Sequence, residues 1–314
     1  YAIIANPEDK PKSIFISGFD SAPLAPDYNL LISGQEKVFQ TGIDVLKKLT
    51  DGKVHLTLNG RTTPEAVFSN AAGVQINKIS GPHPAGCVGI QIHHIDPINK
   101  NDIVWTVNPM DVARIGKLFT EGKYDAQKIV ALAGPGVKEP QYYRTMTGAC
   151  IEDMVSGNVI DEELRYISGN PLTGSRIAKK GFLGFYHYQV SVLEEGIKPL
   201  FFGWGMPRLK RFSVSRSFLS WLMSKKQFNI TTNYHGRHRA YVVTGQYEKV
   251  LPIDILPVYL MKSIIVKDID KMEALGIYEV AEEDLALCEF VCTSKIEVQS
   301  IVREGIDLMI KELS

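Results

Sequence analysis

The sequence predicts a protein of the α/β plus α+β class with three successive domains. Residues 12–124 alternate short β-rich runs with helical periodicity, which is typical of a layered α/β domain. From Lys128 the helical pattern nearly disappears, and short β-runs are separated by glycine-rich turns. Apolar residues return to helical spacing after Asp268. We therefore place the domains at residues 1–126, 127–266 and 267–314.

The first domain is predicted to contain strands and helices in βαβα order. Gly18 closes the first strand, a polar and proline-rich loop follows at 19–27, and Gly52 ends the first helix. The expected strands are 13–16, 54–58, 74–79 and 103–107, and the expected helices are 38–49, 66–68 and 110–124.

The second domain is predicted to be mostly β and the third to be a helical cap. Runs 129–132 and 164–167 have strand character, and the alternation from Phe185 to Val192 indicates one half of a hairpin. In the third domain, 282–291 and 298–309 repeat apolar residues at helical spacing.

The composition is that of an ordinary globular protein. The 314 residues carry 35 Lys and Arg against 35 Asp and Glu, and 45% are hydrophobic, which excludes a disordered, collagen-like or coiled-coil chain. A net charge of zero gives no general attraction to nucleic acid or anionic lipid. The most apolar stretch, 250–266, is interrupted by prolines and charged residues, whereas a bilayer span needs roughly 20 apolar residues in a row. No membrane-spanning segment is therefore expected.

The cysteines indicate the redox compartment of the protein, and the first residue indicates whether the sequence is a fragment. Four cysteines are too few and too scattered for a disulfide framework in a chain of this size, which favours a reducing, cytosolic compartment. The chain begins with Tyr1 rather than Met, and no signal peptide precedes the fold. We therefore expect a fragment of a longer protein.

The turn 81–86, with the sequence GPHPAG, lies between an expected strand and an apparent helix. Ligands of α/β sheets gather at this end of the strands. The turn is not a GxGxxG loop, and its two prolines remove backbone donors that a phosphate loop would supply. The sequence is therefore consistent with two interpretations, a structural turn and a turn that faces a ligand.

Two pairs of histidines are weak candidates for a site. His93 and His94 are adjacent, so on a helix they project about 100° apart and cannot both face one metal. Buried or helix-end histidines are favoured there. His235 and His238 lie in a basic run, for which a solvated loop is favoured over a turn that meets an acidic partner or ligand.

Cys288 and Cys292 lie four apart on one face of an expected helix, where two thiolates could begin a metal or iron–sulfur site. The remaining ligands are missing, because Cys87 and Cys150 stand in no paired motif. Packing thiols are therefore favoured. The chain has no nucleophile elbow, Walker loop, zinc-binding helix motif or paired catalytic carboxylates, so residue spacing alone names no reaction.

A resemblance to one family nevertheless extends along the whole chain. It rests on several blocks in a fixed order, namely 81–86, 104–106, 131–135, 167–174 and 282–292, to which 202–204 and 247–250 add support. Together these blocks resemble the A subunit of the bacterial sodium-translocating NADH:quinone oxidoreductase.

The resemblance implies a Rossmann-like degenerate flavin domain, a β-grasp domain of the ubiquitin-like, SLBB type with a β-rich extension, and a helical cap related to an iron–sulfur domain. It implies distant kinship to the C subunit of the Rnf complex and to the flavin-binding NADH-dehydrogenase subunit of complex I. It also implies that a biotinyl-lipoyl-like domain precedes Tyr1 and that a few residues follow Ser314 in the full-length protein.

Two departures from those relatives suggest lost chemistry. Ser21 and Ala22 stand where the Rnf protein has Cys and Glu in its flavin loop. A ferredoxin-like run of cysteines is reduced to Cys288 and Cys292, which would be vestigial and hold no metal. The resemblance thus implies a chain that has no catalytic residue and binds no cofactor of its own, while its complex uses NADH, quinone and Na+.

The expected role is that of a peripheral subunit on the cytoplasmic face of the bacterial inner membrane. Its expected partners are the other subunits, especially the membrane-embedded B subunit, with a contact to quinone and none to nucleic acid. The walls of a ligand pocket would come from the ancestral flavin crevice. These residues are Ile16, Gly18, Phe19, Asp20, Gly81, His83 and Gly86.

Two alternatives assign the chain to other classes of protein. The chain could be a purely structural assembly subunit, with the pocket filled by side chains. An independent soluble flavin dehydrogenase is disfavoured by the altered loop at Ser21 and Ala22, and a colourless preparation would exclude it.

Overall fold

The structure is a computed structural model, and it describes residues 3–160, 162–196, 209, 211–214, 216, 218–223 and 227–313. Block 202–204 of the family resemblance lies outside these residues. The chain divides into two compact units. Unit 1 comprises Tyr1–Ala126, Tyr241–Cys292 and Ile296–Ser314, and unit 2 comprises Gln127–Ala240 and Thr293–Lys295.

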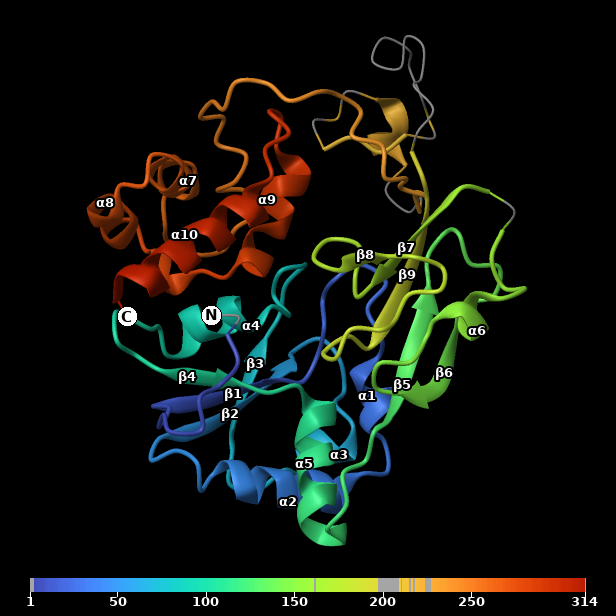
Figure 1. The fold of residues 1–314 in the computed structure, drawn as a ribbon, viewed down its shortest axis with the longest axis vertical. Coiled ribbons are helices and arrows are strands. Elements are labelled where there is room, and N and C mark those ends of the chain that lie inside the picture. Colours follow the sequence, from blue (N-terminus) through green and yellow to red (C-terminus); the bar gives the residue numbers. More distant parts are fainter. Residues whose placement is uncertain are drawn as a thin grey trace. The chain divides into compact units, whose positions relative to one another are not determined.

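A parallel sheet forms the centre of the first part of unit 1 (Figure 1). Its strand order is β3-β2-β1-β4, with β1 at Ser13–Ser17, β2 at Lys53–Asn59, β3 at Gln75–Ile79 and β4 at Val104–Thr106. The helices are α1 (Tyr28–Ile32), α2 (Glu36–Leu46), α3 (Ala66–Ser69), α4 (Val88–Ile95) and α5 (Pro109–Glu121). The predicted α/β order is confirmed. Helix α1 was not predicted, because a single helical turn is too short to show a hydrophobic period in the sequence.

The two faces of this sheet differ in chemistry. Ile14 and Ile16 lie in one apolar core with residues of α2 and α5. On the other face, Phe15 packs against Ile92 of α4. Ser17 is also on that face, because successive side chains of a strand point to opposite sides. Figure 1 shows α4 across the sheet from α2 and α5.

Helices α2 and α5 touch through their backbones. A Cβ atom on Gly42 would lie 2.0 Å from the carbonyl oxygen of Val112, and one on Gly116 would lie 1.7 Å from that of Val38. Asn108 caps the start of α5, since its side chain accepts a hydrogen bond from the backbone N–H of Met110. The close approach therefore depends on two glycines that have no side chain.

Unit 2 is built on a mixed sheet of order β6-β5-β9-β7-β8. Its strands are β5 (Gln127–Ala133), β6 (Gln141–Met146), β7 (Leu164–Ser168), β8 (Ser175–Ile177) and β9 (Gln189–Glu194), and α6 (Glu152–Val155) packs beside them. Only β5 and β9 pair in parallel. The predicted strands are confirmed, but β9 begins at Gln189 rather than Phe185, because Phe185 and Tyr186 are exposed before it.

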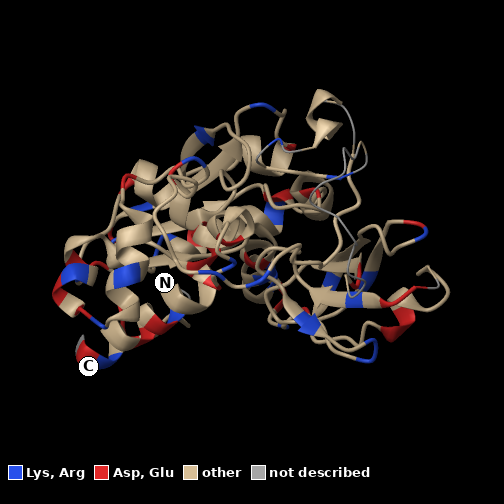
Figure 2. Cartoon of the chain, turned by 90° about the horizontal axis from the view of Figure 1, so that it is seen from above, with Lys and Arg blue, Asp and Glu red and all other residues tan. Residues whose placement is uncertain are grey.

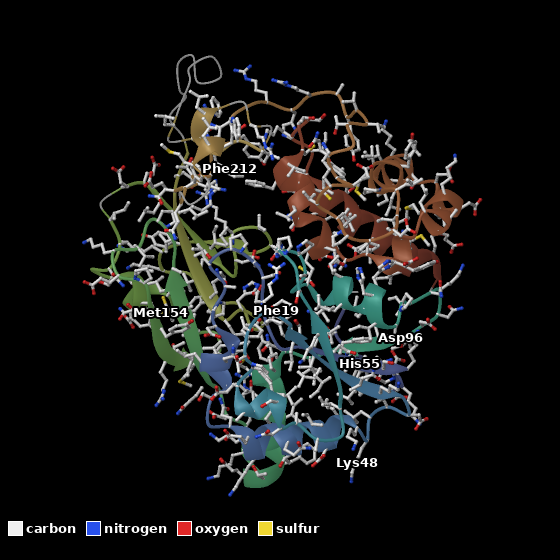
Figure 3. The ribbon with its side chains drawn as sticks, turned by 180° about the vertical axis from the view of Figure 1, so that it is seen from behind. Phe19, Lys48, His55, Asp96, Met154 and Phe212 are labelled. Atoms are coloured by element: carbon white, nitrogen blue, oxygen red, sulfur yellow. The ribbon has the colours of Figure 1, made fainter. Side chains whose placement is uncertain are left out.

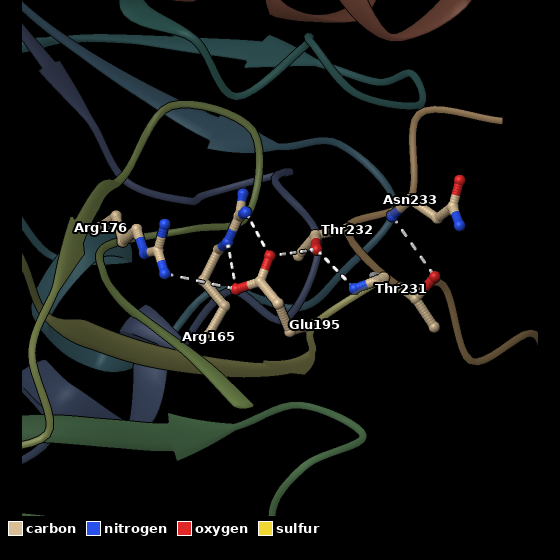
Figure 4. A network of polar contacts seen from close by, with 7 residues as sticks. Arg165, Arg176, Glu195, Thr231, Thr232 and Asn233 are labelled. Carbon is tan, nitrogen blue, oxygen red and sulfur yellow. Dashed lines mark hydrogen bonds and ion pairs between the residues drawn. The ribbon is translucent and has the colours of Figure 1, made fainter. Parts of the chain in front are cut away.

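A polar network holds the end of β9 to a later segment of unit 2 (Figure 4). Arg165 donates from Nε to a Glu195 carboxylate oxygen at 3.0 Å, and its Nη2 also contacts that carboxylate. The hydroxyl of Thr232 donates to Glu195 at 2.8 Å and accepts from the N–H of Gly196. The hydrogen bond from Arg165 lowers the pKa of Glu195.

The C-terminal part of unit 1 is helical, with α7 (Pro257–Ile265), α8 (Ile269–Ala274), α9 (Ala286–Val291) and α10 (Val298–Leu313). The 3-10 turns η2 (Ile277–Glu279) and η3 (Glu282–Leu285) connect them, and η1 (Leu219–Leu222) belongs to unit 2. The predicted helices of the third domain are therefore present, the first of them as η3 followed by α9.

The boundary expected at residue 266 differs from the structure. Leu251, Val258 and Leu260 lie in one apolar core with Val298 and Val302 of α10. The reason is that α7 is a helix rather than part of a β domain. Pro257 stands at its first turn, where a missing N–H costs nothing, and this proline together with β-branched residues hides the helical pattern in the sequence. The described residues of 209–250 contain no strand, contrary to the β-rich texture of that stretch.

Charged side chains of both signs are scattered along the ribbon (Figure 2). This agrees with the equal numbers of cationic and anionic residues. Within the described ranges, every helix is too short or too polar to cross a bilayer, as the sequence predicted.

Gly116→Ala is expected to lower the free energy of unfolding by about 3 kcal/mol, because the added methyl group would push α5 away from α2. In a freely exposed helix the same change would stabilise by about 1 kcal/mol, so the sign of the effect is diagnostic. Urea unfolding measures it. Thr120→Ala, on the exposed side of α5, is the matched control and should stay near wild type.

Glu195→Gln is expected to lower the stability at neutral pH by about 2 kcal/mol, because the Arg165 guanidinium loses its charged partner. A carboxylate with a lowered pKa stabilises the fold above its unfolded pKa, and this contribution disappears as the pH falls. The difference between wild type and variant should therefore shrink from about pH 5 to about pH 3. Glu194→Gln is the control, and an equal loss there would contradict the assignment.

Candidate functional site

The loop after β1 and the turn before α4 meet through a serine. Ser21 Oγ accepts a hydrogen bond from the N–H of Gly86 at 2.8 Å and lies 3.0 Å from His83 Nδ1. A Cβ atom on Gly86 would lie 2.5 Å from the backbone nitrogen of Ser21, so this approach requires a glycine. Phe19 belongs to the same loop at the carboxyl end of β1 (Figure 3).

Ser17, the last residue of β1, extends these contacts toward α4. Its hydroxyl is within hydrogen-bond distance of the carbonyl oxygens of Phe19 and Gly86, at 2.9 and 3.2 Å. Gln91 of α4 donates from Nε2 to Ser17 Oγ at 2.8 Å. We call Ser17, Ser21, His83, Gly86 and Gln91 the polar cluster.

Two atoms at the ends of the polar cluster are buried without a partner in the part of the chain that the structure describes. They are His83 Nε2 and Gln91 Oε1. Because Ser21 Oγ already accepts from Gly86, its own hydrogen can go to His83 Nδ1, which places the ring hydrogen on Nε2. Burial lowers the pKa of His83, so the ring is neutral at pH 7. The cluster thus offers one unused donor and one unused acceptor.

Carboxyl groups gather beside this cluster. Asp20 accepts a hydrogen bond from the N–H of Ala22 at 2.8 Å, and burial raises its pKa. Asp284 of η3 lies against Gly89 in the first turn of α4, where a Cβ atom would be 2.1 Å from its Oδ2. Burial also raises the pKa of Glu283 and of the Cys87 thiol, which interacts electrostatically with Glu283, Asp284 and Asp20.

The expected pocket residues do not all face one place. Phe19, Asp20, His83 and Gly86 lie in or next to the polar cluster. Ile16 is 0% exposed and is enclosed in the core with α2 and α5, on the face opposite Ser17. The two remaining glycines mark close packing: a Cβ atom on Gly18 would lie 2.7 Å from Leu58 Cδ2, and one on Gly81 would lie 3.2 Å from the Cβ of Ala85.

The sequence pointed to the turn 81–86 but missed Gln91, Glu283 and Asp284 as members of the site. Gln91 stands on a helix whose pattern is apolar. Glu283 and Asp284 stood inside a block quoted for the family resemblance, which was the available signal. Their distance in sequence from β1 hides their proximity to Asp20.

Cys288 and Cys292 are buried free thiols in the core of the C-terminal helices. The hydroxyl of Tyr247 donates to Cys292 Sγ at 3.1 Å, and burial raises the pKa of Cys288 to about 12. Such thiols pack rather than react, because the thiolate is the reactive form. Among the residues that are described, no group of three or more His, Cys, Asp or Glu side chains could hold a metal ion. The expectation that the chain holds no metal stays a prediction.

The two pairs of histidines differ in their surroundings. His93 and His94 lie in the last turn of α4, where the sequence favoured helix-end histidines. His93 Nδ1 lies 3.1 Å from a carboxylate oxygen of Glu279, and His94 Nδ1 lies 2.8 Å from the carbonyl of Ile90. His235 and His238 are outside any helix or strand, in the loop that the sequence predicted.

A shallow pocket of about 470 Å³ opens at the other end of the parallel sheet. Its lining includes Lys10, Lys12, Asp51 and Asp102. The lysines are paired with these aspartates, Lys12 with Asp102 at 3.1 Å. Their charges are therefore neutralised within the chain, and the polar cluster remains the better candidate.

Comparison with known proteins gives the family. Residues 1–124 match the family "NqrA second alpha/beta domain", and residues 129–179 match an SLBB-type family described as "NQRA C-terminal domain". Both agree with the fold class that the sequence predicted. Two crystal structures of an NAD+-reducing NiFe-hydrogenase are similar at TM-scores of 0.48 and 0.49, with 14% identity over 97% of this chain and 55% of that chain.

Curated relatives cover nearly the whole chain. The A subunit of the Na(+)-translocating NADH-quinone reductase of Vibrio atlanticus is 41% identical over 306 residues, which are 97% of this chain and 68% of that protein. The protein of the same name from Yersinia pestis biovar Antiqua is 42% identical over 300 residues, 95% of this chain and 66% of that protein. The chain therefore belongs to the family of A subunits of the Na(+)-translocating NADH-quinone reductase.

Proposed function

We propose that this chain contacts quinone in a complex that couples NADH oxidation and quinone reduction to Na+ export. The names of its relatives supply NADH, quinone and Na+ as the substrates of the complex. In this proposal NADH is oxidised elsewhere in the complex, and the present chain supplies neither a catalytic residue nor a cofactor.

The chain would act as a peripheral subunit on the cytoplasmic face of the inner membrane. Its partners would be the other subunits of the complex, above all the membrane-embedded B subunit. Family membership supports a place among other subunits.

The observation that carries the quinone contact is the pair of unpartnered atoms in the polar cluster. A buried polar atom that lacks a hydrogen bond costs about 1–3 kcal/mol, so such atoms need an explanation in a folded protein. His83 Nε2–H can donate to a carbonyl oxygen, which a quinone ring provides. The cluster also lies at the carboxyl end of β1, where parallel sheets bind ligands.

A second function, a purely structural subunit, is favoured by the packing around β1. Ile16 is enclosed in the core, and Gly18 lies close to Leu58. These contacts fill part of the place where the sequence expected a pocket. In this alternative the polar cluster only joins the loop after β1 to the turn before α4.

His83→Ala is expected to weaken the binding of a short-chain ubiquinone by about tenfold, because the Nε2–H donor is lost. Isothermal titration calorimetry measures the affinity of wild type, of His83→Ala and of Phe19→Ala/His83→Ala. The double variant should bind no more tightly than His83→Ala.

His94→Ala is the matched control, since this histidine bonds to the carbonyl of Ile90 in its own helix. Its affinity should equal that of wild type. Equal affinities of wild type and His83→Ala would remove His83 from the contact. The absence of saturable binding, both in this chain and in the assembled complex, would favour the structural alternative.

A further inference from the structure

One long stretch of the chain carries cations without any anion. No Asp or Glu stands between Glu195 and Glu248, although this stretch contains nine Lys and Arg. The whole chain has a net charge of zero, so the other residues carry the compensating negative charge. The segment 196–240, which belongs to unit 2, therefore has a strong positive charge of its own.

The turn η1 lies within this segment and exposes large apolar side chains. Four residues of the turn and its end are between 42% and 62% exposed, namely Leu219, Trp221, Leu222 and Met223. The turn is anchored from beneath, because Phe218 is buried and Ser220 donates from Oγ to the backbone carbonyl of Arg211. The exposed apolar side chains are therefore presented by a turn that the rest of the segment holds in place.

Arginine side chains lie against the aromatic residues of η1. The guanidinium carbon of Arg216 lies 5.8 Å from the centre of the Trp221 ring, and that of Arg211 lies 5.0 Å from the centre of the Phe218 ring. Within the described ranges, no carboxylate forms an ion pair with Arg216. A guanidinium that stacks on an aromatic ring keeps its N–H donors for another molecule. We call Arg216, Leu219, Trp221, Leu222 and Met223 the η1 patch.

Further cations follow in the same segment. Arg237 and Arg239 are exposed, and among the residues that the structure describes neither has an acidic partner. The N–H of Arg239 donates to the carbonyl of Ser294 at 3.0 Å, and a Cβ atom on Gly236 would lie 3.6 Å from Cε of Lys295. The chain packed beside this turn therefore adds a positive charge instead of neutralising it.

The chemistry of the η1 patch fits a protein surface better than a lipid surface. Protein interfaces are enriched in aromatic residues, Met and Arg, all of which occur in the patch. A helix that lies on a membrane needs a long apolar face, whereas η1 has 4 residues. Family membership makes the chain one subunit of a larger complex. The positive charge of the segment is complementary to an acidic surface on the partner.

We propose that the η1 patch is a docking surface for another subunit of the complex, whose facing surface is acidic and has an apolar pocket for Trp221. This inference rests on the proposed place of the chain among the other subunits and is independent of the quinone contact. Trp221 and Leu222 would lose their contact with water on docking, which provides affinity. The cations of the segment would attract the acidic surface and fix the orientation of the two proteins.

Docking of the full chain on the complex that lacks its A subunit tests the proposal. Biolayer interferometry measures the Kd at low and at high concentrations of KCl. For wild type, the Kd should rise at least about tenfold between about 50 and about 500 mM KCl, because salt screens the attraction between the charges. Trp221→Ala should raise the Kd at low salt by at least about tenfold, because the central aromatic side chain of the patch is lost.

Arg216→Glu is expected to raise the Kd at low salt by about tenfold and to weaken its salt dependence, because an attractive charge becomes repulsive. Two matched controls lie outside the patch. Phe119→Ala removes an exposed aromatic ring from α5, and Arg144→Glu reverses an exposed charge on β6. Both should dock as wild type does, and thermal melting confirms that each variant is folded.

The outcomes separate this inference from the proposed function. Wild-type docking by both Trp221→Ala and Arg216→Glu would overturn the η1 patch as the docking surface and leave the chain among the other subunits. Binding of wild type to vesicles of phosphatidylglycerol, lost in Trp221→Ala while docking on the complex is unchanged, would assign the patch to lipid and overturn the inference. No docking of folded wild type would overturn the inference together with the proposed place in the complex.

Discussion

Unit 1 depends on the way α4 is held between two apolar cores. Ile92 packs against Phe15 on one face of the parallel sheet, while Ile90 lies in the core of the C-terminal helices. The contact of Asp284 with Gly89 fixes the first turn of the same helix. One short helix thus joins residues 241–292 to the α/β sheet, and Asp284 of η3 approaches the backbone of α4 only because Gly89 has no side chain.

One face of the parallel sheet packs into an apolar core, and the other carries the polar groups of the candidate site. Ile14 and Ile16 bury their side chains in an apolar core with residues of α2 and α5. The opposite face carries polar groups, among them Ser17, His55 and Gln91, all of which are partly or fully buried. Because side chains alternate along a strand, a residue of β1 can serve only one of these faces. This is why Ser17 enters the polar cluster and Ile16 does not.

Much of the fold could be predicted because local periodicity reports which face of an element is buried. The alternation in β1, β5 and β7 and the spacing in α5 and α10 depend only on near neighbours. The helix α7 could not be recognised, because Pro257 at its start resembles a break. Of the site, the sequence could locate Asp20, His83 and Gly86, which follow strands. Gln91 follows Gly86 closely in the chain but stands on a helix whose pattern is apolar. Glu283 comes near Asp20 only through tertiary packing, which no single sequence displays.

The unpartnered atoms of the polar cluster argue against a role limited to scaffolding. A scaffold gains nothing from His83 Nε2 and Gln91 Oε1 buried without partners among the described residues. Apolar residues of similar size would hold the same segments together at lower cost. A ligand with a carbonyl group would satisfy the free donor of His83. The unpartnered atoms that weaken unit 1 as a scaffold are therefore those that would let it bind a ligand.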